Sequence, residues 1–459
     1  MKIKKLLLCV IINICSISLI SCSSPGNISD TTLQIQADDP VVYGANGWGD
    51  SYSINESGIL YGKDNTLRYY DINAGESYII CGKANCAHSD DECGAWFDNV
   101  ESVAGIALYN GKIYLSKKNP QKNTFDLISM NATGEEQKTL MSLEIGNVQN
   151  NSWVLASIED TYYCSDYAIV GLNYNYVEDS LSQAENINCK QYLIVDLSSG
   201  ETTAINERTK DSIEYKLVGV SEKNILFRKL SNEVSKFSET EFVQKYKDGD
   251  FKSESFFSND LEQSYFDYVN KWYPANCKRT ETYCYYDLES KKEIILEATD
   301  AKITYDENGY QTGELAKYLI IGTYNDNYLV SEPDWENRSE SISLWDIYNN
   351  HKTNILVLEN GGTLAWEKGS AGLNIFDNGK FLYCIYKEGG EAEVHLYDLD
   401  SNKDQYLFSD NANISFRIID DTQEFFIGKI YTDFGYEVYK IRKDDYYRGY
   451  VDKAVQINL

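Results

Sequence analysis

Short apolar strands alternate with polar turns along almost the whole chain, and the alternation repeats. At seven places a polar turn runs into a short run of apolar or aromatic residues. Runs rich in β-branched and aromatic side chains, bounded by Gly, Asn, Asp and Ser, predict β-strands joined by hairpins. The seven copies begin at Ser57, Asn110, Glu159, Glu222, Asn325, Asn378 and Thr422.

A second pattern recurs between these copies, in which a strand ends in an apolar or aromatic residue followed by Asp. An Asp in this position can accept backbone N–H groups two residues further on, so we expect each one to stabilise a turn. Residues 129–134 and 440–445 are degenerate versions. The clear copies place this residue at Asp71, Asp196, Asp287, Asp346 and Asp398.

The repeat predicts an all-β fold, a seven-bladed β-propeller. A unit of about 40 to 60 residues with four strands has the size of a propeller blade, and six or eight blades would also fit the pattern. Blades stack around an axis because a single blade cannot bury both faces, and closing the ring hides strand edges. We expect a strand near residues 32–43 to complete the last blade together with residues 455–459.

Two insertions interrupt the repeat. Residues 174–188 are a polar extension of the third unit and predict an exposed hairpin loop. Residues 231–282, in the fourth unit, change to a helical period. Ser238 and Glu241 have the spacing of a capping box at a helix start. The sequence therefore predicts a small helical lobe on a β scaffold.

The second half of the helical insertion is rich in aromatic residues. We expect a helix from Ser258 or Asn259 to just before Pro274. An aromatic stripe on a helix usually packs a core, which is one interpretation. The other is a platform for a glycan or a partner protein, because aromatic faces bind sugars and anchor interfaces. The candidate ligand-binding residues are Phe257, Tyr268, Trp272 and Tyr273.

The N-terminus has the pattern of a secretory signal. Three lysines in residues 1–5 precede fifteen uncharged residues, 6–20, which are too few to span a bilayer as a helix. The tetrapeptide that ends at Cys22 resembles a bacterial lipobox, in which cleavage leaves a cysteine that carries lipid such as palmitate. We expect a signal peptide at 1–21, a flexible linker at 22–31 and the propeller domain at 32–459. An ordinary secreted protein or an uncleaved signal anchor is the alternative.

The chain is strongly acidic, with 71 Asp and Glu against 42 Lys and Arg. Removal of residues 1–21 leaves 39 basic residues and a formal net charge of −32. Such a surface repels polyanions, so nucleic acid is not an expected partner. Hydrophobic residues make up 42% of the chain and 38 residues are tyrosine, which is enough for a large core. We expect a monomer held by its lipid at the outer face of the cytoplasmic membrane.

The most specific local motif is a group of three cysteines and a histidine. Cys81, Cys86, His88 and Cys93 could supply the four corners of a tetrahedral, structural zinc site. In an exported protein a disulfide that leaves one cysteine over is an equally open interpretation, and reduced thiols in a packed loop are a third. The spacing does not match the C-x-x-C-H pattern of covalent haem attachment.

The signal peptide with its lipobox, the Tyr-Tyr-Asp hairpin at residues 69–71 and this motif together resemble a family. It comprises uncharacterised lipid-anchored β-propeller lipoproteins of Gram-positive anaerobic bacteria, with the form C-x-x-P-N-C-x-H-x-x-x-x-C near the end of the first blade. Ala84 stands where that family has proline. The resemblance covers the first quarter of the chain well and implies a fold and a location. It implies no activity.

Other motifs are weaker. The remaining cysteines suggest two disulfides, Cys164 with Cys189 and Cys277 with Cys284. Residues 398–404 resemble the opening of a calcium loop, but lysine replaces its glycine at Lys403. The two other histidines, at positions 351 and 395, are expected to be surface or packed residues. Zinc-protease, serine-hydrolase, Walker and dinucleotide motifs are absent from the sequence.

Two hypotheses for function follow. The preferred one is a non-catalytic surface module that binds a glycan, a peptide or a partner protein, with the aromatic insertion as the site. The alternative is an exported glycan-cleaving enzyme that uses paired carboxylates in the central channel of the propeller.

Overall fold

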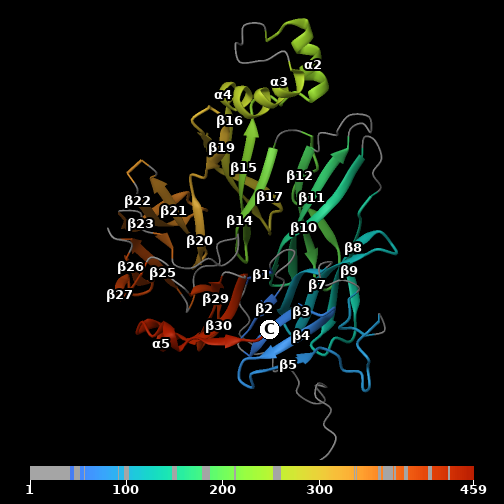
Figure 1. Cartoon of the computed structure of the whole chain (residues 1–459), viewed down its shortest axis with the longest axis vertical. Helices are drawn as coiled ribbons and strands as arrows, with labels where there is room; N and C mark the ends of the chain where they lie inside the picture. The colour runs from blue at the N-terminus through green and yellow to red at the C-terminus, as the bar shows by residue number, and fades with distance from the viewer. Residues whose placement is uncertain are drawn as a thin grey trace, which may run out of the picture.

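The computed structural model of the chain is a ring of seven β-sheets with a small helical lobe at one end of one sheet (Figure 1). Each sheet contains four strands in sequential antiparallel order, with one extra strand added to the third sheet, and this confirms the predicted seven-bladed β-propeller. The structure describes residues 42–45, 52–55, 57–90, 93–97, 103–146, 152–177, 187–210, 213–251, 260–334, 336–337, 339–359, 363–364, 376, 379–386, 391–411, 416–432 and 435–459.

The first three blades follow one another along the N-terminal half of the chain. The first comprises β2 (Tyr52–Ile54), β3 (Gly58–Lys63), β4 (Thr66–Asp71) and β5 (Glu76–Ile79). The second comprises β6 (Val103–Tyr109), β7 (Lys112–Asn119), β8 (Thr124–Asn131) and β9 (Lys138–Glu144). The third comprises β10 (Ser152–Cys164), β11 (Tyr167–Val177), β12 (Ile187–Asp196) and β13 (Thr202–Ala204), with β1 (Val42–Ala45) as a fifth strand.

The remaining four blades complete the ring. The fourth comprises β14 (Ile213–Val220), β15 (Asn224–Asn232), β16 (Arg279–Asp287) and β17 (Lys292–Asp300), and the fifth comprises β20 (Leu319–Tyr324), β21 (Asn327–Asp334), β22 (Ser339–Asp346) and β23 (His351–Leu358). The sixth comprises β24 (Thr363–Leu364), β25 (Lys380–Tyr386), β26 (Glu391–Asp398) and β27 (Lys403–Asn411). The seventh comprises β28 (Arg417–Asp421), β29 (Phe425–Thr432), β30 (Gly435–Arg442) and β31 (Val455–Ile457), with the short helices α5 (Lys443–Tyr447) and η3 (Val451–Lys453) before β31.

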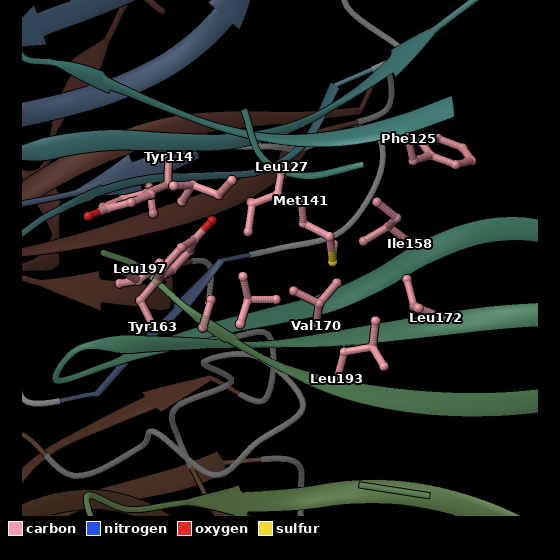
Figure 2. Close-up of a cluster of buried hydrophobic side chains, with 14 of the residues drawn as sticks. Tyr114, Phe125, Leu127, Met141, Ile158, Tyr163, Val170, Leu172, Leu193 and Leu197 are labelled. Carbon is pink, nitrogen blue, oxygen red and sulfur yellow. The ribbon is translucent and has the colours of Figure 1, made fainter. Parts of the chain in front are cut away.

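The hydrophobic core is divided into one cluster at each interface between neighbouring blades. Side chains of a strand alternate between its two faces, so consecutive residues serve different interfaces. In β15, Ile225 and Phe227 pack against the third blade, while Leu226 between them packs against the fifth. Figure 2 shows the interface between the second and third blades, where Met141 and Val170 point toward each other from facing sheets. The alternation explains why the blade strands are apolar on both sides.

Tyrosine hydroxyl groups link neighbouring blades. Tyr163 of the third blade donates to the carbonyl oxygen of Gly105 in the second, at 3.1 Å. Tyr328 of the fifth blade donates to Asn224 Oδ1 in the fourth, at 2.6 Å. A tyrosine ring fills an apolar interface while its hydroxyl group reaches a polar partner. This pairing gives the abundant tyrosines a structural role.

The recurring Asp residues stabilise the turns between third and fourth strands, as predicted. Asp196 Oδ1 accepts the backbone N–H groups of Ser198 and Ser199, at 2.9 and 2.7 Å. The carboxylates at positions 71, 287, 346 and 398 accept backbone N–H groups in the same way. These hydrogen bonds favour the ionised carboxylate, and side-chain and backbone bonds from Ser198 and Ser199 lower the pKa of Asp196.

Residues 455–457 lie in the last blade, as predicted, but the described end of the predicted N-terminal strand does not join them. Of the segment expected to complete the last blade, residues 32–41 lie outside the described residues, and β1 pairs antiparallel with β10 of the third blade. Val42 lies opposite Cys164, and Ala45 opposite Thr161. The first strands of the blades contact one another around the axis, so the free edge of β10 faces the centre of the ring. β10 is 13 residues long, and its open inner edge can accept another strand.

The last blade takes all four of its strands from the C-terminal end of the chain, because β31 pairs with β30. It meets the first blade through side chains. Ile427 and Ile457 of the seventh blade pack with Ile54, Ile59 and Tyr61 of the first. Burial of apolar side chains between the two blades therefore closes the ring.

The two mouths of the ring differ. The turns that join first and second strands lie at one mouth, which we call the turn mouth. Tyr167 donates from its hydroxyl group to the carbonyl oxygen of Glu222, at 2.9 Å, between two such turns. Val42 pairs at this end of β10, so the N-terminal strand enters from the turn mouth. The helical lobe connects β15 to β16 at their other ends, at the mouth we call the lobe mouth (Figure 1).

The third blade differs from prediction at its lobe-mouth end. β11 continues to Val177 and β12 begins at Ile187, so residues 174–177 and 187–188 at the two ends of the predicted loop are strand. Tyr174 and Tyr176 are buried there. Residues 178–186 lie outside the described residues.

The lobe occupies residues 233–278. Helix α2 (Glu239–Asp248) has the predicted capping box of Ser238 and Glu241. Helix α3 (Leu261–Asp267) is capped by Asp260, and the predicted start at residues 258–259 lies outside the described residues. Within the described chain, no helix is both long and apolar enough to cross a bilayer.

The sequence predicted that the second helix ends just before Pro274. The helical segment instead continues through this residue. After α3, a turn of π-helix, η2 (Tyr268–Trp272), leads into α4 (Tyr273–Asn276), which contains the proline in its first turn. Proline lacks an N–H group and is tolerated in the first turn of a helix, where that group has no helical partner. The π-turn creates such a position in the middle of a helical segment.

Candidate functional site

The cysteine motif lies in the connection between the first and second blades. Cys81 follows β5, and Cys93 begins the segment that returns to pair beside β4, where the N–H of Leu67 donates to the carbonyl oxygen of Ala95, at 2.7 Å. Asn85 and His88 adopt left-handed backbone angles, with φ of 59° and 52°. These two turns fold the connection back on itself. Residues that would lie far apart in an extended chain therefore come together here.

The four side chains of the motif converge. The Sγ atoms of the three cysteines and a ring nitrogen of His88 all lie within 4.8 Å of one another. His88 Nδ1 lies 3.3 Å from Cys93 Sγ. Two thiolates on one tetrahedral zinc ion are about 3.8 Å apart, because each Zn–S bond is about 2.3 Å. The spacing and the donor set therefore fit a closed four-coordinate site. Among the described residues, this is the one such group of potential ligands.

The environments of the thiols differ. Cys81 and Cys93 are 5% and 2% exposed, while Cys86 and His88 lie half-buried at the surface. Burial raises the pKa of Cys93 to about 12. A hydrogen bond from the backbone of His88 lowers the pKa of Cys86. A bound metal ion favours the thiolate form of every ligand, so it would remove the proton that burial holds on Cys93.

The connection is fastened to the second blade. The N–H of Gly82 donates to the carbonyl oxygen of Thr133, at 3.0 Å, and Gln137 Nε2 donates to the carbonyl oxygen of Gly94, at 2.9 Å. A side chain at Gly94 would collide with Gly134, because its Cβ would lie 2.0 Å from the carbonyl oxygen there. An ion between Cys81 and Cys93 would hold both ends of this excursion at the interface of two blades.

The predicted disulfides do not form. All eight cysteines of the described chain are free. Cys164 lies opposite Tyr167 at the turn mouth, while Cys189 lies opposite Tyr174 at the lobe-mouth end of the same blade. Cys277 packs in the lobe and Cys284 in the interface between the third and fourth blades. Cys164 and Cys189 are separated because they lie at opposite ends of one blade, and Cys277 and Cys284 because they pack in different clusters.

The aromatic residues of the lobe pack against one another. Tyr268 and Tyr273 are 1% and 7% exposed, and Trp272 stacks on Tyr268 with ring centroids 5.7 Å apart. Phe242 of α2 lies at 5.0 Å from the Tyr268 ring. The core interpretation of the aromatic stripe is therefore confirmed, and these rings do not form an open platform. Phe257 lies outside the described residues.

A second hairpin braces the lobe. Strands β18 (Lys302–Tyr305) and β19 (Gln311–Leu315) form a separate sheet between the fourth and fifth blades. Tyr310 donates to Asp267 Oδ1 at 2.7 Å, and Tyr305 donates to the carbonyl oxygen of Pro274 at 3.0 Å. The sequence interpretation missed this hairpin, although its Asn308-Gly309 turn is a hairpin signal.

A cavity of about 1150 Å³ lies where the lobe, this hairpin and the ends of the third and fourth blades meet. Lys190 comes from the third blade, Arg279 from the fourth, Gln311 from the hairpin and Asn270 from the lobe. Tyr273 is the one of the three described ligand-binding candidates that lines it. We call this space the lobe cavity. It is the residues around the aromatic core, rather than the aromatic faces, that form its walls.

The other sequence candidates are structural where they are described. His395 stacks on Tyr383 with centroids 5.0 Å apart, and its Nδ1 lies 3.2 Å from Asp404. Asp404 also accepts from the Tyr383 hydroxyl, while Asp400 accepts from Tyr324, so the carboxylates of the calcium-like segment serve different partners. Cys22 lies outside the described residues. A catalytic carboxylate pair in the central channel stays a prediction.

Comparison with known proteins shows the fold alone. No protein-family model matches the chain, and no curated protein sequence matches it. The β-propeller domain of the Trilobed protease from Pyrococcus furiosus has a TM-score of 0.42 and 9% identity, over 91% of this chain and 97% of that one. Oligogalacturonate lyase from Vibrio parahaemolyticus has a TM-score of 0.39 and 10% identity, over 75% and 74%. TolB from Acinetobacter baumannii has a TM-score of 0.28 and 11% identity, over 93% and 83%. The chain, which is a seven-bladed β-propeller by its own strand order, distantly resembles these proteins.

Proposed function

We propose that the chain is a lipid-tethered, non-catalytic propeller that binds a glycan, a peptide or a partner protein in the lobe cavity. The lobe cavity is the observation that carries the proposal. Its volume of about 1150 Å³ is slightly above the range of about 300 to 1,000 Å³ that is typical of ligand sites. Four separate elements form its walls, and the hydrogen bonds from Tyr305 and Tyr310 brace the lobe in place. A site that is already formed saves the free energy of ordering it on binding.

The position of the N-terminal strand supports a tether at Cys22. β1 enters at the turn mouth, and the lobe lies at the opposite mouth. Nineteen residues lie between Cys22 and Val42, and this segment reaches at most about 70 Å when extended. A chain held in this way carries its turn mouth on the tethered side, and the lobe cavity is then open to ligands in solution.

The lobe can be removed without breaking the fourth blade. Asn232 and Arg279 pair directly across β15 and β16, so a two-residue Asn-Gly turn can replace residues 233–278. The full chain in detergent would be screened by thermal unfolding against glycans and peptides. A ligand at 100 times its Kd stabilises the fold by about 2.7 kcal/mol. We expect the deletion to abolish the resulting rise in Tm.

A second variant separates loss of the site from damage to the fold. Thr240 is exposed at the start of α2 and lines the lobe cavity, so Thr240→Trp fills the cavity from its wall. We expect this variant to unfold at the wild-type temperature without ligand and to lose the ligand-dependent rise. Ligand capture that survives both changes would show that the lobe is not the site.

The tether is tested by Cys22→Ser. The proposal predicts that the variant leaves the membrane fraction, whereas the wild type stays there after a high-salt wash. A variant that still fractionates with membranes and still resists salt extraction would rule out the lipid anchor.

We also infer that the cysteine cluster holds a structural zinc ion. Three cysteines and a histidine with mutual distances up to 4.8 Å are a donor set that structural zinc sites use. Four protein ligands leave no open position for a substrate, which favours a structural role. Metal analysis and a thiol count on anaerobically purified protein test this. The expected result is one zinc ion per chain and eight titratable thiols at the described cysteines after unfolding in chelator.

A further inference from the structure

Most of the charges around the lobe cavity are neutralised within the protein. Lys190 pairs with Glu159 at 2.6 Å, and Arg279 pairs with Glu214 at 3.3 Å and with Glu314 at 2.7 Å. A cation that is already paired attracts a further anion only weakly, because the first carboxylate cancels most of its charge. These residues therefore favour an uncharged ligand over a charged one.

The other charged side chains of the lining do not change this balance. Glu241 Oε2 accepts the backbone N–H of Ser238, at 2.9 Å, in the cap of α2. Lys210 has its Nζ 3.7 Å from the centroid of the Tyr176 ring. Lys236 is a single exposed lysine, and solvent and salt screen an exposed charge strongly.

Uncharged amides are the polar groups that the cavity leaves open to a ligand. Four of them come from the third blade, the fourth blade and the hairpin, and their side chains make no hydrogen bond to the rest of the described chain. An amide offers both donors and an acceptor, as does each pair of neighbouring sugar hydroxyl groups. The four are Asn173, Asn188, Asn232 and Gln311.

Asn173 carries the clearest sign of a missing partner. It lies in β11 opposite Lys190, so the sheet fixes its position. Its Oδ1 atom is buried and accepts no hydrogen bond from the part of the chain that the structure describes. A buried acceptor without a donor costs free energy, because it has given up its hydrogen bonds to water. A hydroxyl group that donates to this amide would recover that free energy.

An exposed aromatic pair lies beside the lining. Phe266 is 53% exposed, and the centroids of the Phe266 and Tyr310 rings are 5.9 Å apart. Asn270, which lines the cavity, donates from Nδ2 to the carbonyl oxygen of Phe266 at 3.0 Å, and Tyr310 directly precedes Gln311 of the lining. The flat apolar face of a sugar ring packs well on an exposed aromatic ring.

We propose that the lobe cavity binds a neutral oligosaccharide, whose hydroxyl groups pair with the four amides and whose chain packs on Phe266 at the rim. The inference rests on the proposed binding function and specifies the chemical class of its ligand. A peptide held in an apolar groove would leave the amides without partners. A cavity of about 1150 Å³ has room for several sugar units.

The test is calorimetric titration of the full chain, in a detergent without a sugar head group. The probes are cellotetraose, mannotetraose, galactotetraose and N-acetylated chitotetraose, with tetragalacturonate as the acidic comparison. We expect at least one neutral tetrasaccharide to bind at one site per chain, and the lobe deletion to abolish this binding. Its affinity should not change with salt, because a neutral ligand has no charge to screen.

Three variants locate the site. Asn173→Ala and Gln311→Ala should each weaken binding about fivefold, since each removes one neutral hydrogen bond. Phe266→Ala should weaken it by a similar factor through loss of ring packing. The matched control is Gln244→Ala, because Gln244 is an exposed glutamine on α2 of the same lobe and does not line the cavity. All four variants should unfold at the wild-type temperature without ligand.

The remaining outcomes overturn the inference. Neutral saccharides that fail to bind, or that bind the two amide variants as tightly as the wild type, exclude the neutral class at this site. Binding of tetragalacturonate alone, or of a peptide, that is lost with the lobe deletion also excludes it and leaves the binding function in place. If no ligand of either kind responds to the deletion, the binding function fails as well.

Discussion

Substitution of Cys86 should destabilise the chain by breaking the zinc site with little loss of packing. Cys86 is half-buried at the surface, so replacing its sulfur with oxygen costs little apolar burial. It would leave three ligands for the ion. The matched control is Cys277→Ser, because Cys277 is also a half-buried free thiol and lies outside the cluster, in the lobe.

The expected magnitude follows from the loop that the ion closes. Cys81 and Cys93 bound a closed segment of 13 residues. Fixing the ends of a loop of this length removes denatured-state entropy worth about 3 kcal/mol at 25 °C. Unfolding entropy of about 2.1 cal/mol/K per residue gives about 1 kcal/mol/K for 459 residues, so the loss corresponds to about 3 °C in Tm.

The assay is thermal unfolding of anaerobically purified chain, with and without a high-affinity zinc chelator. Wild type and Cys277→Ser should each lose about 3 °C on chelation, while Cys86→Ser should start about that much lower and not respond further. Equal behaviour of the two serine variants would refute the zinc site. A wild type with fewer than eight titratable thiols would instead favour a disulfide.

Three further predictions test the fold. Gly134→Ala should lower the free energy of unfolding, measured in urea, by about 1 to 3 kcal/mol more than Gly75→Ala does. Both glycines have φ above 70°, but only the new Cβ at Gly134 would lie 2.4 Å from a carbonyl oxygen, that of Ile80. Equal losses of stability would contradict the clash. Tyr328→Phe should lower the free energy of unfolding by about 1 to 3 kcal/mol, because the buried Oδ1 of Asn224 loses the hydroxyl group that donates to it. An unchanged midpoint of urea unfolding would mean that this hydrogen bond contributes nothing to stability. Turn hydrogen bonds lower the pKa values of Asp196, Asp287, Asp346 and Asp398, so their stabilisation is complete above the unfolded pKa of about 3.9 and is lost as pH falls below it. Asp346→Asn keeps the Oδ1 acceptor and removes the titration, so its Tm should fall less than that of the wild type between pH 5 and pH 3, to be measured by thermal unfolding; an identical fall would contradict the assignment.

The blade pattern could be predicted because it is local. In a strand such as β15, consecutive apolar residues point to opposite faces. The run of apolar residues therefore indicates by itself that both faces are buried. The Asp turns are equally local, since donor and acceptor lie two or three residues apart. The capping box of α2 was found for the same reason. Interactions within about five residues leave a readable sequence pattern.

The candidate site was predicted only in part, because it depends on distant contacts. The convergence of Cys81 with Cys93 requires left-handed turns at Asn85 and His88, and histidine is only a weak sequence signal for such a turn. The lobe cavity joins Lys190 to Gln311 across more than a hundred residues. The aromatic residues drew attention to the insertion that borders the lobe cavity, but their bulk fills its core. The residues that line a cavity are set by tertiary packing, which a sequence period does not encode.

The path of the N-terminal strand would separate the proposed tether from the closure of the ring. In a propeller whose N-terminal strand completes the last blade, a pull on the N-terminus acts on the strand that closes the ring. Here β1 adds to the third blade, which already has four strands, and the ring closes through the packing of Ile427 and Ile457 on the first blade. Loss of the pairing between Val42 and Cys164 would therefore leave seven complete four-stranded blades. If the chain is tethered by lipid as proposed, it can release its N-terminal strand under load while the lobe mouth keeps its shape.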